Sequence, residues 1–202
     1  MITYDYKNSF NDHYSNCFYK SKNTSKAKKD IVGESYENLR KGWIRNCGLD
    51  IATKEEKENF KNLFGGAYDA DQYIVDANTR ILLALEEDKG HYVDKCFFKR
   101  ALINAVEMIA YCLKKEIDIP YFILSCPTRY KDYESQMTWL LDELALFDDK
   151  VVEICKSKFK FFYHCSHGRT DRKKYLTSNQ NPFIIEDNLV QKEKDFFSLI
   201  KG

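Results

Sequence analysis

Residues 67–90 read AYDADQYIVDANTRILLALEEDKG, and this stretch decides the fold. Two segments, 67–75 and 81–89, are rich in the aromatic and branched side chains that favour strands. The link between them, residues 76–80, consists mostly of turn-forming residues. A short link of this kind predicts a β-hairpin, and the glycines at 65, 66 and 90 mark its two ends.

The second segment of the hairpin ends in the acidic and basic residues Glu87, Asp88 and Lys89. Strand side chains alternate between faces, so Glu87 and Lys89 are expected to point one way and Asp88 the other. The apolar residues at 81, 83 and 85 are expected to share the Glu87 face, which places the charged pair where a buried strand leaves the core. A hairpin is expected to bring Asp71 to this end only if the strands splay or their register is offset.

Asp71, Glu87 and Lys89 together suit the hydrolysis of a phosphodiester. Carboxylates hold Mg²⁺ through oxygen, and the metal polarises the phosphate and helps to generate hydroxide. A lysine can orient the attacking water and offset the charge of the transition state. With 31% charged residues, a chain contains such spacings by chance. An apolar strand lies between the acids, and a helix and a further strand follow. This context favours a catalytic site over charges that are merely solvated.

On these residues the chain resembles the PD-(D/E)xK nuclease superfamily, which includes the type II restriction endonucleases. The resemblance covers roughly residues 34–126, and its matching residues are Asp71, Glu87 and Lys89. It implies that the two acids bind Mg²⁺ and that the lysine assists the attacking water. Ala70 stands where the superfamily motif has proline, a departure that is common there.

Further residues near the hairpin are candidates for the same site. The resemblance implies a third metal ligand from the preceding helix, Glu37, with Glu34 as the alternative, although both also fit exposed helix positions. Glu86 is expected on the opposite face from Glu87, so it is a spare acid rather than a ligand. Lys99 and Arg100 begin the next helix and either contact phosphate or are ordinary surface charges.

The order of the other elements predicts an α/β fold. Strands are predicted at 121–126 and 159–165, and helices at 31–47, 53–64, 95–116, 133–158 (one helix or two) and 187–200. Alternation of strands and helices predicts a central mixed β-sheet flanked by helices, and the resemblance implies that it is restriction-endonuclease-like. The helix at 95–116 is expected to return the chain beside the motif strand. We expect one nuclease domain over 1–202, with 1–30 a polar N-terminal arm.

Composition is that of a folded protein without a membrane span. Hydrophobic residues make up 44% of the chain, and no apolar run approaches the roughly 20 residues that cross a bilayer. Seven cysteines without a CxxC spacing indicate buried, reduced thiols in a cytoplasmic protein. The sequence His164-Cys165-Ser166-His167 allows a zinc site, but it lacks a second ligand pair nearby.

The strongest candidate for nucleic-acid contact follows the strand at 159–165. It contains five basic or imidazole side chains: His167, Arg169, Arg172, Lys173 and Lys174. Arginine can read guanine in the major groove, while lysines hold phosphates. A solvated loop is the competing interpretation, and residues 129–131 are a second candidate segment.

These observations predict a Mg²⁺-dependent endonuclease that cuts double-stranded DNA, as a sequence-specific type II restriction enzyme does. Cutting both strands needs two active sites, and one chain carries one motif, so a homodimer is expected. A repair or junction-resolving nuclease of the same fold is the first alternative. A non-catalytic interaction or immunity protein, with an accidental motif, is the second.

Overall fold

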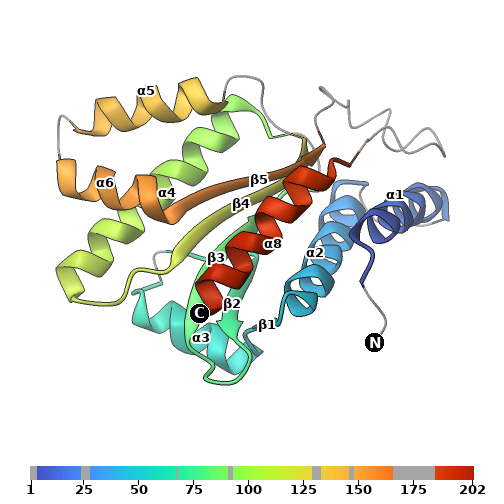
Figure 1. The fold of residues 1–202 in the computed structure, drawn as a ribbon, viewed down its shortest axis with the longest axis horizontal. Coiled ribbons are helices and arrows are strands. Elements are labelled where there is room, and N and C mark those ends of the chain that lie inside the picture. The colour runs from blue at the N-terminus through green and yellow to red at the C-terminus, as the bar shows by residue number, and fades with distance from the viewer. Residues whose placement is uncertain are drawn as a thin grey trace.

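The computed structural model describes residues 4–23, 28–66, 68–90, 93–128, 133–145, 148–165 and 185–202. These ranges build a mixed five-stranded sheet in which the strands lie in chain order (Figure 1). The pairs β1–β2 and β2–β3 are antiparallel, whereas the pairs β3–β4 and β4–β5 are parallel. The strands are β1 (Leu49–Ile51), β2 (Gln72–Asp76), β3 (Leu82–Asp88), β4 (Tyr121–Thr128) and β5 (Phe159–Cys165).

Helices cover both faces of the sheet, which confirms the predicted α/β class (Figure 1). One face carries α1 (Tyr6–Asn23), α2 (Lys28–Asn46) and α8 (Asp187–Lys201). The other face carries α3 (Lys54–Leu63), α4 (Lys95–Lys115), α5 (Tyr133–Ala145) and α6 (Asp149–Lys158). The region predicted as one helix or two is therefore two, α5 and α6. No helix within the described ranges is both long enough and apolar enough to cross a membrane.

Local capping explains where the helices around the hairpin begin. The Thr53 side chain accepts from the Glu56 backbone N–H, and the Glu56 carboxylate accepts from the Thr53 N–H, which together form a capping box. Asp94 caps α4 by accepting from the Phe97 N–H at 2.8 Å. Helix α4 then carries the chain across the sheet, and β4 returns parallel to β3 as predicted.

Each face of the sheet has its own hydrophobic core, and β3 contributes to both. Leu85 packs with the α4 side chains Phe98 and Leu102 on one face. Ala84 packs with the α2 residues Tyr36 and Ile44 on the other. All six side chains are buried. Burial on both faces explains why β3 is continuously apolar until its last three residues.

The N-terminal stretch is more ordered than the polar arm that its composition predicts. Over Tyr6–Asn23 it is the helix α1, which packs along α2 and buries Phe10 and Cys17. Five of the seven cysteines are buried, as predicted. Ser35 lies inside α2, and its hydroxyl is 2.8 Å from His13 Nδ1 of α1. The apolar residues of α1 are widely spaced among polar ones, so the sequence did not predict this helix. They are buried because α2 supplies the surface against which they pack.

A β-bulge changes the side-chain alternation expected along β3. Ile74 pairs with Ala84 but Val75 pairs with Leu82, so Leu83 is an extra residue in the ladder. Leu83 consequently packs with the α2-side core, and Ile81 is 61% exposed. Of the residues expected on the Glu87 face, only Leu85 lies in that core. A bulge of one residue reverses the alternation beyond it, and nothing in the sequence marks its position.

Candidate functional site

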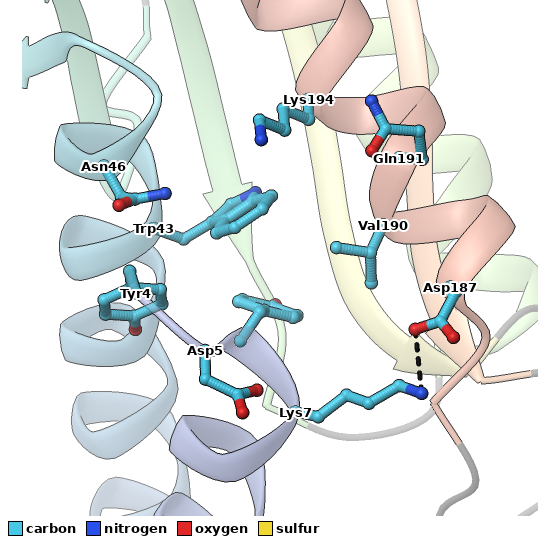
Figure 2. Close-up of a pocket in the computed structure, with 10 residues that line it drawn as sticks. Tyr4, Asp5, Lys7, Trp43, Asn46, Asp187, Val190, Gln191 and Lys194 are labelled. Atoms are coloured by element: carbon cyan, nitrogen blue, oxygen red, sulfur yellow. Dashed lines mark ion pairs between the residues drawn. The ribbon is translucent and has the colours of Figure 1, made fainter. Parts of the chain in front are cut away.

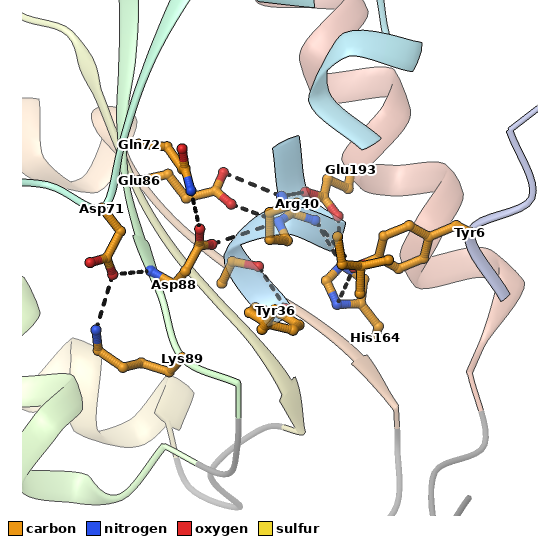
Figure 3. Close-up of polar contacts among 12 residues, drawn as sticks. Tyr6, Tyr36, Arg40, Asp71, Gln72, Glu86, Asp88, Lys89, His164 and Glu193 are labelled. Atoms are coloured by element: carbon orange, nitrogen blue, oxygen red, sulfur yellow. Dashed lines mark hydrogen bonds and ion pairs between the residues drawn. The ribbon is translucent and has the colours of Figure 1, made fainter. Parts of the chain in front are cut away.

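The hairpin register places Asp71 directly against the end of β3. Strand β2 begins at Gln72, later than predicted, and Gln72 pairs with Glu86, so Asp71 faces Glu87 across the ladder. The register of the ladder shifts by one residue between Ile74 and Val75, and beyond this shift the start of β2 meets the end of β3. Asp71 Oδ2 accepts the Asp88 backbone N–H at 2.7 Å, which fixes the carboxylate at this position (Figure 3).

Lys89 links the two predicted metal-binding acids. Its Nζ lies 3.1 Å from Asp71 Oδ2 and 3.1 Å from Glu87 Oε2. The three side chains are only 17–29% exposed, so the site is partly buried. The ring of Phe97, at the start of α4, lies 4.8 Å from the same Nζ. The structure thus brings together all three predicted catalytic residues.

Gly90 sets how closely α2 approaches this site. A Cβ at position 90 would lie 2.7 Å from the Val32 carbonyl oxygen and 3.1 Å from the Tyr36 Cβ. A contact this short with a backbone atom requires the helix to move. Only glycine therefore allows α2, which carries Glu37, to lie against the chain that leaves β3.

The protonation of the site reflects burial among several charges. Burial raises the pKa of Glu87, and the charge of Asp71 adds to this, while Lys89 opposes both. Burial would lower the pKa of Lys89, but Asp71 and Glu87 outweigh it and raise that pKa. The lysine is therefore charged at neutral pH, and two carboxyl groups share its one ammonium.

Glu37 is the better placed of the two candidate third ligands. It is half-buried, whereas Glu34 is exposed. Burial, followed by the charge of Asp71, raises the pKa of Glu37, and Lys41 and Lys89 lower it. These interactions place the Glu37 carboxylate within the field of the motif residues.

The donor set fits a hard divalent cation. It consists of carboxylates, and both Asp71 contacts use Oδ2, which leaves Oδ1 for a ligand. No group of three or more His, Cys, Asp or Glu side chains is arranged around a metal position in the described part of the chain. Lys89 instead stands between the two acids. Asp71, Glu87 and Glu37 are the residues that would hold Mg²⁺.

The opposite face of β3 carries a buried ionic network centred on Arg40 of α2. Its Nε lies 2.6 Å from Glu86 Oε1 and 3.9 Å from Asp88 Oδ1, and Nη2 binds Glu193 of α8. Glu193 Oε2 lies 2.6 Å from His164 Nε2 of β5. Arg40, Glu86, Glu193 and His164 have no exposed side-chain surface. Figure 3 shows this network and the motif residues on the two sides of β3.

This network gives a structural role to two residues whose role the sequence did not decide. Glu86, kept as a spare acid, is fully buried and balances Arg40. His164, considered for zinc, is held by Glu193, while His167 lies outside the described residues. Sequence reasoning missed Arg40, although a signal exists. It sits in the apolar stripe of α2, one turn after the buried Tyr36 and one turn before the buried Ile44.

The predicted nucleic-acid contacts lie outside the described residues. These are His167, Arg169, Arg172, Lys173 and Lys174, together with the second candidate segment at 129–131. Two aromatic residues at the site were not predicted. Tyr68 is buried, and its interaction with the Glu87 carboxyl group lowers the pKa of that carboxyl, while Phe97 packs against Lys89. Neither has a sequence signal, because their roles depend on how loops and helix ends meet β3.

A cavity of about 540 Å³ lies elsewhere, between α1, α2 and α8 (Figure 2). Tyr4, Trp43 and Val190 line it, and an ion pair of 2.7 Å between Lys7 and Asp187 closes one side. None of the motif residues lines this cavity. It carries charges of both signs and is separate from the carboxylate site.

Comparisons with protein families, with curated proteins and with solved structures find no match to this chain.

Proposed function

We propose that this protein is a Mg²⁺-dependent endonuclease that hydrolyses phosphodiester bonds in double-stranded DNA, as a sequence-specific type II restriction enzyme acting as a homodimer. The observation that carries the proposal is the contact of Lys89 Nζ with both Asp71 and Glu87, at 3.1 Å each. Two carboxylates and an ammonium converge there at one end of a hairpin. The order of the elements around it, an antiparallel hairpin, a crossover helix and a parallel strand, supports the restriction-endonuclease-like fold.

Each residue has a role that follows from its chemistry. Asp71, Glu87 and Glu37 would hold Mg²⁺, which supplies Lewis acidity to the phosphate. An ammonium has three N–H donors, and two of those on Lys89 contact carboxylates. The third is available to a water or a phosphate oxygen, which it orients and whose developing charge it offsets. Tyr68 opposes the rise in the pKa of Glu87, which favours the charged form of this carboxyl group.

Metal-dependent cleavage of supercoiled plasmid DNA tests the proposal. We expect Mg²⁺ or Mn²⁺ to support cleavage and Ca²⁺ to support binding with little turnover. Asp71→Asn, Glu87→Gln and Lys89→Met should each reduce cleavage at least about 100-fold, because each removes a charge from the reacting centre. Asp69→Asn is the matched control, since Asp69 is exposed and pairs with Lys57 and Lys61 instead.

The products then separate the alternatives. Discrete fragments indicate sequence readout, and cleavage confined to branched DNA indicates a junction-resolving or repair enzyme. Cleavage of wild type and Glu87→Gln at equal rates would refute a catalytic role for the motif. No cleavage and no DNA binding by wild type would favour an interaction or immunity protein.

A further inference from the structure

We propose that Arg100 binds a backbone phosphate of the DNA substrate beside the reacting one, an inference that rests on the proposed nuclease function. The observation behind it is an aromatic ring shared by two cations. The Lys89 Nζ lies 4.8 Å from the centroid of the Phe97 ring, and the Arg100 Cζ lies 4.8 Å from the same centroid. The Arg100 guanidinium and the Lys89 ammonium therefore lie within twice that distance of each other.

The start of α4 fixes this arrangement. Asp94 accepts the Phe97 backbone N–H, so Phe97 occupies a defined place in the first turn. Arg100 follows three residues later and projects from the same side of the helix. Phe97 is half-buried, whereas Arg100 is exposed. The ring thus faces the site on one part of its surface and supports a solvent-accessible guanidinium on another.

The charge of the site creates a need for such a cation. Asp71 and Glu87 both pair with the one ammonium of Lys89, and Glu37 interacts electrostatically with Asp71. A phosphodiester that approaches this site meets more carboxyl groups than ammonium groups before a metal binds. Arg100 makes no ion pair with any carboxylate of the described ranges, so its charge is not offset there. It is suited to attract the anionic backbone.

The structure also distinguishes Arg100 from Lys99, which the sequence could not. Lys99 Nζ lies 4.1 Å from the centroid of Trp139 on α5, so it is directed to the neighbouring helix. Arg100 is directed to the ring beside Lys89. A guanidinium stacked on a ring keeps its N–H fork available for two phosphate oxygens. Its stacking also restricts its rotamers before the substrate arrives, which reduces the entropy lost on binding.

The test measures binding and cleavage in the same set of variants. Affinity for a short fluorescent DNA duplex of mixed sequence is measured in Ca²⁺ over a series of salt concentrations, and plasmid cleavage is measured in Mg²⁺. The variants are Arg100→Ala, Arg100→Lys, Lys99→Ala and Lys114→Ala. Lys114 is the matched control, because it is an exposed cation in the last turn of the same helix, at the opposite end from Arg100.

We expect Arg100→Ala to weaken binding about tenfold and to lower the slope of log K against log salt by about one unit. Arg100→Lys should recover only part of the affinity, because it restores the charge without the planar fork. Lys99→Ala and Lys114→Ala should each change affinity less than about twofold.

Three results would overturn the inference. If wild type cleaves DNA but Arg100→Ala behaves like Lys114→Ala, the proposed function stands and the role of Arg100 is wrong. If Lys99→Ala weakens binding as much as Arg100→Ala, the contact is a diffuse positive surface rather than one phosphate site. If wild type neither binds nor cleaves DNA, the proposed function fails and the inference fails with it.

Discussion

Asp71 does more at the site than contribute a negative charge. Its Oδ2 accepts a backbone N–H from Asp88 and a side-chain N–H from Lys89, so one atom ties the end of β3 to the start of β2. Two hydrogen bonds on one oxygen hold that carboxylate in a single orientation. Glu37, by contrast, reaches the site from α2 and is placed by the packing of that helix.

Glu37 and Glu34 should respond differently to neutral substitution. Glu37→Gln removes a charge that interacts with Asp71, so the Mg²⁺ concentration for half-maximal cleavage should rise about tenfold, with a smaller change in the maximal rate. Titration of plasmid cleavage with Mg²⁺ measures both. Glu34→Gln is the control and should match wild type, since Glu34 is exposed. The reverse pattern would assign the third ligand to Glu34.

Cleavage should increase as pH rises through the acidic range. Burial and Asp71 raise the pKa of Glu87, and only the deprotonated carboxylate binds a metal. Higher Mg²⁺ competes with protons, so it should move the midpoint of the pH–rate profile to lower pH. Profiles at two Mg²⁺ concentrations test this. A midpoint that does not change with Mg²⁺ concentration would show that the group titrating in the profile does not bind the metal.

At the scale of elements, α1 depends on a buried neutral histidine. Burial lowers the pKa of His13 from an ordinary value of 6.5 to about 4, although the contact with Ser35 opposes this. Between those two pH values the unfolded chain binds more protons than the folded one. The contribution of His13 to the free energy of unfolding is therefore largest above pH 6.5. It falls by roughly 3 kcal/mol as pH decreases towards 4 and then levels off.

Replacing His13 should remove this pH dependence. Asn retains a polar group near the position of Nδ1, which contacts the Ser35 hydroxyl, but does not titrate. Urea unfolding of wild type and His13→Asn from pH 7 to pH 4 measures the difference. We expect His13→Asn to start less stable and to lose less stability on acidification. Parallel curves would show that His13 is protonated in the folded state as readily as in the unfolded state.

At the scale of the whole molecule, the Arg40 network joins elements from both ends of the chain. It connects α2, β3, β5 and α8 through fully buried charges. Burial would raise the pKa of Glu193, but Arg40 and His164 outweigh it and lower that pKa to about 2. Because the folded pKa is depressed, this contribution to stability is present above the ordinary value of 4.5 and is lost as pH falls towards 2.

Breaking this network should be costly. Arg40→Met leaves Glu86 and Glu193 buried without their cation, and we expect a loss of about 3–5 kcal/mol in the free energy of unfolding. Arg45→Met is the control, because the Arg45 pair with Asp50 is largely exposed and should contribute less than about 1 kcal/mol. Chemical denaturation of both variants gives the comparison. Equal effects would contradict the buried network.

The sequence by itself determined much of the fold and the motif. Turn residues between two apolar runs gave the hairpin, the Thr53 box gave the start of α3, and a stripe with helical spacing gave α4. Asp71, Glu87 and Lys89 were identified from their spacing around an apolar strand, and the hairpin ladder brings them together. Local preferences and short loops are properties of the neighbouring residues alone.

Only the tertiary structure decided the rest. The bulge at Leu83, the partners of Arg40 and the ring that Lys89 and Arg100 share all depend on contacts between elements distant in sequence. The order of α1 likewise depends on the surface of α2. The physical reason is that a charged or bulky side chain has the same local preferences whether it is solvated or buried. Which of the two occurs is set by the chain that packs over it.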